Sequence, residues 1–536
     1  LQMKTTFKPL GIAAAVAAAT AGYAGIVNAQ ATPVLSDNSG LGDLAIVPYY
    51  TTNAGFSTGV SIINTSAYTQ VVKMRLRRAV DSVDALDFNV VLSPDDVYTG
   101  YVQNVDGEIR WYSNDNSCTA PEYSVAGLGD TPSYFIMPDL FRTGAEEGYI
   151  EVVGMAAADS AQPIYASSLH SNGTPFSCDR VRDNFFWGAT PSDYGSTVIN
   201  PLRRGVISSS VTNQLTAAGS TTTVGNSYMD TGNVLKVSYF IKNDATGLEF
   251  GADAVHIADF MQGPSMTNQK FGLFEGDLQG FDYPDLNGGA VFSAVVDGDT
   301  TVGQRGKYEE LRNAIGGTEV INDWSENTTD MFTVDTDWIV TTPGQYNMTN
   351  RFAYLFSIAE GSTTNCFYGD PSVAYDSATG ANCDFRDIPM TALFTVFDRE
   401  ERGIVVDEGD LVVSPQPPGE ISVDVLDQEV NVIRWGTETV VGSAKEITVP
   451  KPAGAQAGWA RLAVVQNGAT VQAICDFTGL SASGKPTIAA PLPVACASTD
   501  SPVPLVGFVA WQRNFGDLPE ANYGRIISHS YTVVSS

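Results

Sequence analysis

The sequence predicts an all-β protein with two or three antiparallel β-sandwich domains, Ig-like or jelly-roll-like, with long loops and few short helices. Short apolar or alternating runs recur along the whole chain, separated by turn residues such as Gly, Pro, Asn and Asp. Charged residues make up only 17% of the chain, and 51 glycines with many Ser, Thr and Asn take their place. This composition is typical of β-rich extracellular proteins.

The N-terminal segment has the features of an export signal. Lys4 and Lys8 form a positively charged start, Leu10–Gly25 is a run of small apolar residues, and residues 27–29 (VNA) resemble a cleavage site. The run is too short and too rich in Ala and Gly to remain as a membrane anchor. We therefore expect residues 1–29 to be a signal peptide. No later stretch is apolar for long enough to predict a transmembrane anchor.

Residues 30–205 are predicted to form an N-terminal β-sandwich. In Val71–Arg78, apolar side chains alternate with Lys73, Arg75 and Arg77. This alternation predicts a half-buried strand whose charged face meets solvent. The other strands expected here are Leu44–Tyr50, Gly59–Asn64, Leu86–Ser93, Val97–Val102 and Gly148–Met155.

Residues 206–413 are predicted to form a middle β-rich domain, which either stands alone or packs with the first. The stretch Ser208–Gly225 is rich in Ser, Thr and Ala and indicates a domain boundary or a long exposed loop. The best predicted helix is Tyr308–Ile315. The strands expected here are Val234–Lys242, Asp337–Thr341, Phe352–Ile358 and Thr391–Phe397.

The segment Ser414–Gly419 (SPQPPG) is the clearest linker signal in the chain. Residues 420–536 beyond it are predicted to form a compact C-terminal β-sandwich that limited proteolysis would release. Its expected strands are Ile421–Val425, Glu429–Trp435, Glu446–Val449, Ala460–Val465 and Val503–Trp511.

The chain is strongly acidic. It has 60 Asp and Glu against 29 Lys and Arg, for a formal net charge of −31. This charge argues against a nucleic-acid partner and disfavours an anionic membrane surface. It indicates either solubility in salty surroundings or a surface that collects divalent cations.

The cysteine count is even, which in an exported chain indicates disulfides. Fifteen pairings of six cysteines are possible, and proximity along the chain favours the sequential ones. The expected pairs are Cys118–Cys178, Cys366–Cys383 and Cys475–Cys496. None of these residues lies in a C-x-x-C motif, so zinc and redox chemistry are not expected.

The sequence contains none of the motifs that mark common enzymes. The three histidines are far apart, and there is no H-E-x-x-H, G-x-S-x-G or P-loop pattern. Two carboxylates could serve glycoside hydrolysis, but with so many acids a candidate pair carries no information without geometry. We therefore expect a non-enzymatic protein without catalytic residues. The seven Trp and 22 Tyr are core residues or platforms for sugar stacking.

Carboxylates in flexible loops are the remaining candidates for chemistry. Asp282, Asp285 and Asn287 precede two glycines, and Asp297 and Asp299 flank Gly298. Ca²⁺ takes six to eight oxygen ligands from such loops, although the spacing is not that of an EF-hand. These residues are the predicted calcium site, and turns closed by Asx hydrogen bonds are the alternative.

A set of strand and turn phrases spread over most of the mature chain resembles an uncharacterised family of secreted or cell-surface proteins of Gram-negative bacteria. The resemblance implies export and a shared fold, and it implies no known activity. The phrases are Leu44–Tyr50, Ile62–Ser66, Val72–Arg75, Ser82–Ser93, Asp337–Thr342, Asp398–Glu401, Asn431–Trp435, Gly458–Leu462 and Ala521–Tyr531.

Together these features predict a structural protein of the cell surface: a self-associating subunit of an S-layer, sheath or filament, in which Ca²⁺ bound by acidic loops would stabilise the assembly. Unpaired sheet edges favour assembly. The alternative is a secreted adhesin or glycan-binding protein with a surface glycan as its partner. Ordered arrays would favour the first hypothesis, and a soluble monomer that binds glycan would favour the second.

Overall fold

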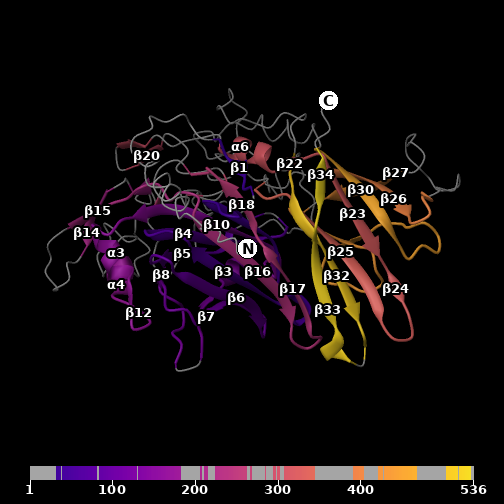
Figure 1. Ribbon diagram of the computed structural model, residues 1–536, viewed down its shortest axis with the longest axis horizontal. Coiled ribbons are helices and arrows are strands. Elements are labelled where there is room, and N and C mark those ends of the chain that lie inside the picture. Colours follow the sequence, from indigo (N-terminus) through magenta and orange to yellow (C-terminus); the bar gives the residue numbers. More distant parts are fainter. Residues whose placement is uncertain are drawn as a thin grey trace, which may run out of the picture. The chain divides into compact units, whose positions relative to one another are not determined.

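The computed structural model describes residues 32–182, 224–261, 307–344, 390–403, 420–466 and 503–532, apart from 38, 81, 83, 129–130, 427 and 517. Pro284, Leu286 and short strands between residues 206 and 301 are also described. Strands make up 55% of the structure and helices 8%, and the strands form several antiparallel sheets (Figure 1). The predicted all-β fold of sandwich type is therefore confirmed.

The first sandwich consists of two sheets, which we name A and B. The side chains of Phe88 in sheet A and Trp111 in sheet B meet in the core between them, with ring centroids 5.7 Å apart. Sheet A has the order β1 (Val34–Leu35), β18 (Val255–Ala258), β2 (Leu44–Thr51), β10 (Glu147–Ala158), β4 (Thr69–Arg78), β5 (Asp84–Leu92) and β8 (Cys118–Ala120). Sheet B has the order β17 (Leu248–Asp253), β16 (Leu235–Asn243), β3 (Ser57–Asn64), β6 (Val97–Val105), β7 (Glu108–Ser113) and β9 (Ser133–Ile136).

The second sandwich consists of sheets C and D. Its core contains stacked Trp324 and Trp435, with ring centroids 5.5 Å apart, together with Trp338. Sheet C has the order β27 (Glu420–Leu426), β26 (Met390–Asp398), β30 (Ala457–Gln466), β23 (Glu319–Ser325) and β34 (Ser530–Thr532). Sheet D has the order β29 (Glu446–Thr448), β28 (Val430–Arg434), β25 (Thr333–Thr341), β32 (Val506–Asn514) and β33 (Tyr523–Ser528), and β24 (Asn327–Thr328) pairs with β25.

The central strands of sheet D, β28, β25 and β32, are largely buried on both faces. One face packs on sheet C, while Ile339, Val432 and Phe508 on the other face belong to the same core as the first sandwich. Across this contact the rings of Tyr239 and Phe508 lie 6.0 Å apart. The Thr341 hydroxyl donates a 2.7 Å hydrogen bond to the carbonyl of Pro48. The two sandwiches therefore share a continuous core.

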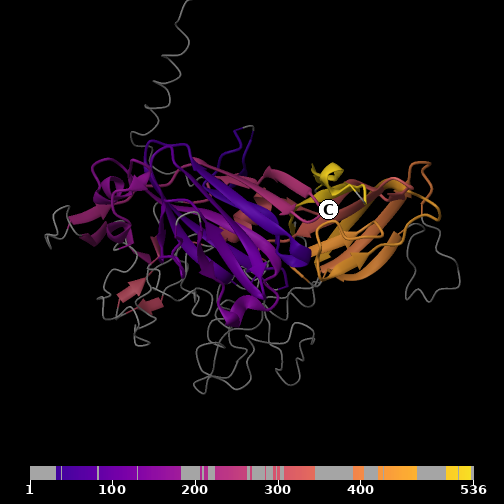
Figure 2. The same cartoon turned by 90° about the horizontal axis from the view of Figure 1, so that it is seen from below.

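The sheets divide the chain differently from the three predicted domains. Strands β16–β18 of the expected middle domain, 206–413, complete the first sandwich, while β23, β25 and β26 belong to the second (Figure 2). Strand β25 lies between β28 and β32, so residues 420–536 do not by themselves contain a complete sheet D. Local linker signals cannot reveal this, because the pairing joins strands distant in sequence. The expected linker Ser414–Gly419 lies outside the described residues.

Helices and short strand pairs lie outside the main sheets. The predicted helix is confirmed as α6 (Lys307–Ala314), whose Leu311 joins the core of the first sandwich. The other described α-helices are α2 (Asp139–Arg142), α3 (Pro163–Ser168) and α4 (Cys178–Arg182), and η1 (Asn53–Gly55) and η5 (Pro519–Ala521) are short 3-10 helices. The short pairs are β11 (His170–Ser171) with β12 (Thr174–Pro175), β13 (Val206–Ile207) with β19 (Met266–Thr267), β14 (Ser210–Gln214) with β15 (Val224–Ser227), β20 (Ala294–Val296) with β21 (Asp299–Thr301), and β22 (Gly316–Gly317) with β31 (Val503–Pro504).

The charged face of β4 is buried, which corrects the prediction of a half-buried strand. Lys73, Arg75 and Arg77 are each at most 1% exposed. Their charges are compensated by carboxylates of the neighbouring strands β5 and β10. The alternation of side chains was correct, but pairing of opposite charges allows this face to be covered.

Candidate functional site

The structure leaves the predicted calcium site untested. Asp282, Asp285, Asn287 and Asp297 lie outside the described residues, and Asp299 begins β21 without a described side chain. Among the described residues, no group of three or more His, Cys, Asp or Glu side chains is arranged to hold a metal ion. None of the described helices is long and apolar enough to cross a membrane.

One of the three predicted disulfides is confirmed. Cys118 at the edge of sheet A is bonded to Cys178 at the start of α4, with Cα atoms 5.1 Å apart. The bond attaches the α3–α4 segment to the sheet. The other four cysteines, Cys366, Cys383, Cys475 and Cys496, lie outside the described residues.

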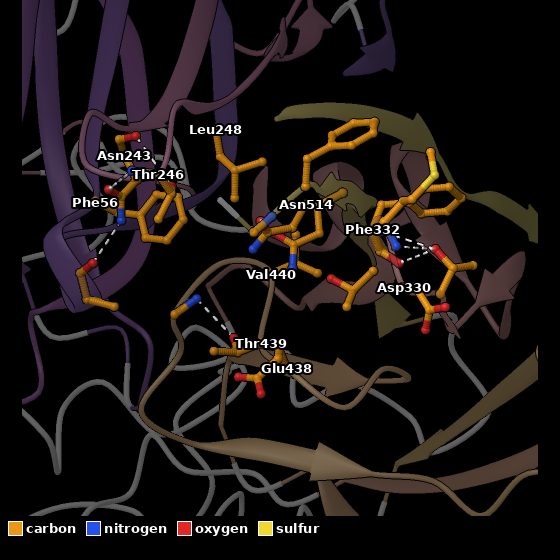
Figure 3. Close-up of a pocket in the computed structure, with 18 residues that line it drawn as sticks. Phe56, Asn243, Thr246, Leu248, Asp330, Phe332, Glu438, Thr439, Val440 and Asn514 are labelled. Atoms are coloured by element: carbon orange, nitrogen blue, oxygen red, sulfur yellow. Dashed lines mark hydrogen bonds between the residues drawn. The ribbon is translucent and has the colours of Figure 1, made fainter. Parts of the chain in front are cut away.

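A cleft of about 570 Å³ lies where turns of the two sandwiches meet, and we name it the junction groove (Figure 3). Its volume falls in the range of small-molecule sites. Phe56, Asn243 and Thr246 approach it from the first sandwich, opposite Phe332 and Asp330 of the second. The described residues that line the groove are Ala54, Phe56, Asn243, Thr246, Leu248, Thr329, Asp330, Met331, Phe332, Thr333, Glu438, Thr439, Val440, Gly442, Gln512, Asn514, Phe515 and Gly516.

Two asparagines hold the turns around the junction groove. Asn243 donates from Nδ2 to the carbonyl of Ala54 over 2.9 Å, and its Oδ1 accepts the N–H of Ala245 over 3.0 Å. Asn522 donates to the carbonyl of Thr246 over 2.8 Å and accepts the N–H of Phe515 over 2.6 Å. Asn522 thus ties the β16–β17 turn of one sandwich to the β32–β33 turn of the other.

The turn between β24 and β25 presents the apolar wall of the groove. The Thr329 hydroxyl accepts the N–H groups of Met331 and Phe332 over 3.2 and 3.0 Å. This closed turn leaves Met331 72% exposed. The centroids of the Phe332 and Phe515 rings lie 5.7 Å apart. The guanidinium of Arg513 lies 4.7 Å from the centroid of the Phe332 ring. Aromatic and cation–π contacts of this kind fix the orientation of a partly exposed ring.

A buried carboxylate supports the floor of the groove. Asp337 on β25 accepts the N–H groups of Val440 and Val441 over 2.7 and 3.1 Å. Burial raises the pKa of Asp337 to about 7, although these hydrogen bonds lower it. Gly442, at φ +70°, completes the loop where a Cβ atom would lie only 2.8 Å from Cβ of Ala54. The loop therefore requires glycine at this contact between the sandwiches.

The lining determines which ligands the groove can accept. Its hydrogen-bonding side chains are amides and hydroxyls, of which Gln512, Asn514 and Thr439 are examples, and its apolar groups include three phenyl rings. Its charged members are the exposed carboxylates of Asp330 and Glu438. Among the residues that the structure describes, the lining contains no Lys, Arg, His, Ser or Cys, although the guanidinium of Arg513 lies against the Phe332 ring. Such a surface suits a neutral polar ligand and repels an anion.

The sequence prediction did not find this groove. Its residues come from five separate turns and strand ends, so no local motif brings them together. The sequence analysis identified none of these turns as part of a site. Pairing of β25 with β32 and packing of sheet D on the first sandwich place these turns side by side.

No protein-family model, no curated protein and no solved structure matches this chain. The resemblance drawn from its strand and turn phrases remains an expectation.

Proposed function

We propose that this protein is a secreted, non-enzymatic binding protein that holds a neutral saccharide in the junction groove. The observation that carries the proposal is the composition of the lining, whose described residues combine amides, hydroxyls and phenyl rings with two carboxylates and include no basic residue. Export is proposed from the N-terminal segment with Lys4, Lys8 and the following apolar run.

A saccharide matches this lining with both its polar hydroxyl groups and its apolar C–H faces. Sugar hydroxyls are donors and acceptors together, and side-chain amides such as those of Gln512 and Asn514 pair with both roles. The C–H faces of a sugar ring are apolar and pack on aromatic rings, which Phe332 and Phe515 offer at the groove wall. The carboxylates of Asp330 and Glu438 accept hydrogen bonds from hydroxyls and disfavour acidic sugars.

The experiment is a binding measurement on the full chain with neutral and uronic-acid oligosaccharides of equal length. We expect binding of a neutral oligosaccharide and weaker binding of the acidic one. Phe332→Ala should weaken binding about tenfold, the equivalent of one well-packed aromatic contact. Glu438→Gln should improve the relative affinity for the acidic oligosaccharide, because it removes one repelling charge.

Phe176→Ala is the matched control. Phe176 is 58% exposed and also packs against an arginine, with the Arg180 guanidinium 5.2 Å from its ring centroid, but it lies outside the groove lining. Its replacement should leave the affinity unchanged. Absence of saccharide binding, or equal weakening by Phe176→Ala and Phe332→Ala, would contradict the proposal.

A role as subunit of a cell-surface assembly remains a prediction from the sequence. Binding in the groove is compatible with it, because a surface glycan is a ligand available to an assembled protein.

A further inference from the structure

The outward face of β4 carries a row of fully buried charges. Lys73 Nζ lies 2.5 Å from Asp87 Oδ2, and both side chains are 0% exposed. Further along the same face, Arg75 Nε pairs with Asp84 over 2.5 Å and Arg77 Nε pairs with Glu151 over 2.6 Å. One buried lysine–carboxylate contact therefore stands beside two arginines that are each paired with carboxylates.

Lys73 differs from the two arginines in its chemistry. A guanidinium keeps its proton under all conditions that proteins meet, whereas a lysine amine can give it up and become a nucleophile. Lys73 also occupies the apolar end of the row. In the β-ladders it stands opposite Asn89 of β5 and Val153 of β10, and the next outward position holds Val71 opposite Val91. The Lys73–Asp87 contact therefore lies where the row borders buried apolar side chains such as Val71 and Val91.

We propose that Lys73 and Asp87 condense to form an isopeptide bond that links β4 to β5. A proton moves from the Lys73 ammonium to the Asp87 carboxylate, which leaves a neutral amine and a neutral acid. The Nζ lone pair attacks Cγ of Asp87, and the C–O bond of the protonated oxygen breaks. That oxygen leaves as water, taking two of the three ammonium protons, and the amide N–H keeps the third. No oxidant, reductant or co-reactant is required.

The fold supplies what makes this condensation favourable. In water, an amine and a carboxylate prefer to remain an ion pair, but groups held in contact react with an effective molarity of about 10⁵–10⁸ M. The β4–β5 ladder holds Lys73 and Asp87 in contact before the reaction. The product replaces two buried charges by one neutral amide, so the desolvation cost of the charges disappears. Asp84 and Glu151 pair with arginines, which cannot form such an amide.

The test is a measurement of the intact mass of the full wild-type chain after denaturation, reduction and alkylation. Its N-terminus is determined on the same sample. The expected mass is lower by one water than the mass calculated from the sequence. Fragmentation of a protease digest should recover one branched peptide that joins Lys73 to Asp87. This measurement requires no variant, so its outcome does not depend on the folding of a mutant protein.

Two variants assign the bond. Lys73→Arg keeps the buried positive charge but cannot form the amide, and it should restore the calculated mass. Lys242→Arg is the matched control, because Lys242 pairs with Asp244 over 3.2 Å on the surface, and it should retain the loss of one water.

The unchanged calculated mass in the wild-type chain would overturn the proposal. A loss of one ammonia would place the bond on Asn89 and would overturn the assignment to Asp87. A loss of one water mapped to another position, such as a succinimide at an Asp-Gly sequence, would overturn it as well.

Discussion

His529 is a buried neutral histidine whose protonation should destabilise the second sandwich. Its Nε2 lies 3.0 Å from the carbonyl of Ile339, and its Nδ1 lies 3.0 Å from Nδ2 of Asn322. The ring therefore donates to the carbonyl and accepts from the amide, an arrangement that only the neutral tautomer can satisfy. Burial lowers the pKa of His529 to about 4 from its ordinary value of 6.5.

The direction in which folding stability changes with pH follows from where the unfolded chain binds a proton and the folded protein does not. Between about pH 4 and 6.5 the unfolded chain binds a proton at His529 that the folded protein does not bind. The stability contributed by the neutral ring is therefore complete above pH 6.5 and is lost as the pH falls toward 4. From pH 7.5 to 4.5 the loss from this residue amounts to about 2.5 kcal/mol.

Other buried groups act in the opposite direction, so the variant must be compared with the wild type at each pH. Burial raises the pKa of Asp43 and Asp337 to about 7, and their protonation on acidification favours the folded state. Urea unfolding of the wild type and of His529→Gln, followed by tryptophan fluorescence, isolates the histidine. The variant should be less stable at pH 7.5, and the difference should shrink by about 2.5 kcal/mol at pH 4.5. A difference that does not change with pH would refute the reasoning.

Three further predictions concern stability and assembly. Replacing Cys118 and Cys178 by Ser should lower the free energy of unfolding by about 4 kcal/mol, the loop-entropy value for residues 60 apart, and unchanged urea unfolding would contradict it. Glu151→Gln should cost about 3–5 kcal/mol because it leaves buried arginine charge uncompensated, whereas Glu400→Gln in an exposed pair should cost less than about 1 kcal/mol. Equal urea midpoints for these two variants would exclude that account. EDTA should lower the melting temperature and loosen any assembly. Ca²⁺ should restore the melting temperature and the assembly better than Mg²⁺. A melting curve that EDTA does not change would contradict the predicted calcium site.

The candidate groove shows the limit of sequence reasoning about function. Aromatic residues and acidic loops were recognised as sugar platforms or calcium ligands in general terms. The residues that line the groove, such as Phe332 and Asn514, carried no signal of their own, because turns in the two sandwiches position them. A convergent site of this kind has no sequence motif.

The sequence by itself predicted the fold class, strands such as Leu44–Tyr50 and the Cys118–Cys178 disulfide. The expected strand Phe352–Ile358 lies outside the described residues. The patterns that predict Leu44–Tyr50 and helix α6 depend on neighbours along the chain, and Cys178 is the cysteine nearest to Cys118 in the sequence, which favours their pairing. Only the tertiary structure decided which strands share a sheet and which charged faces are buried. Strand β25 joins β28 and β32 across about a hundred residues or more, and the charges of Lys73, Arg75 and Arg77 are buried because neighbouring strands supply carboxylates. Periodicity reports which side chains share a face, but the element that packs on that face comes from a distant part of the chain.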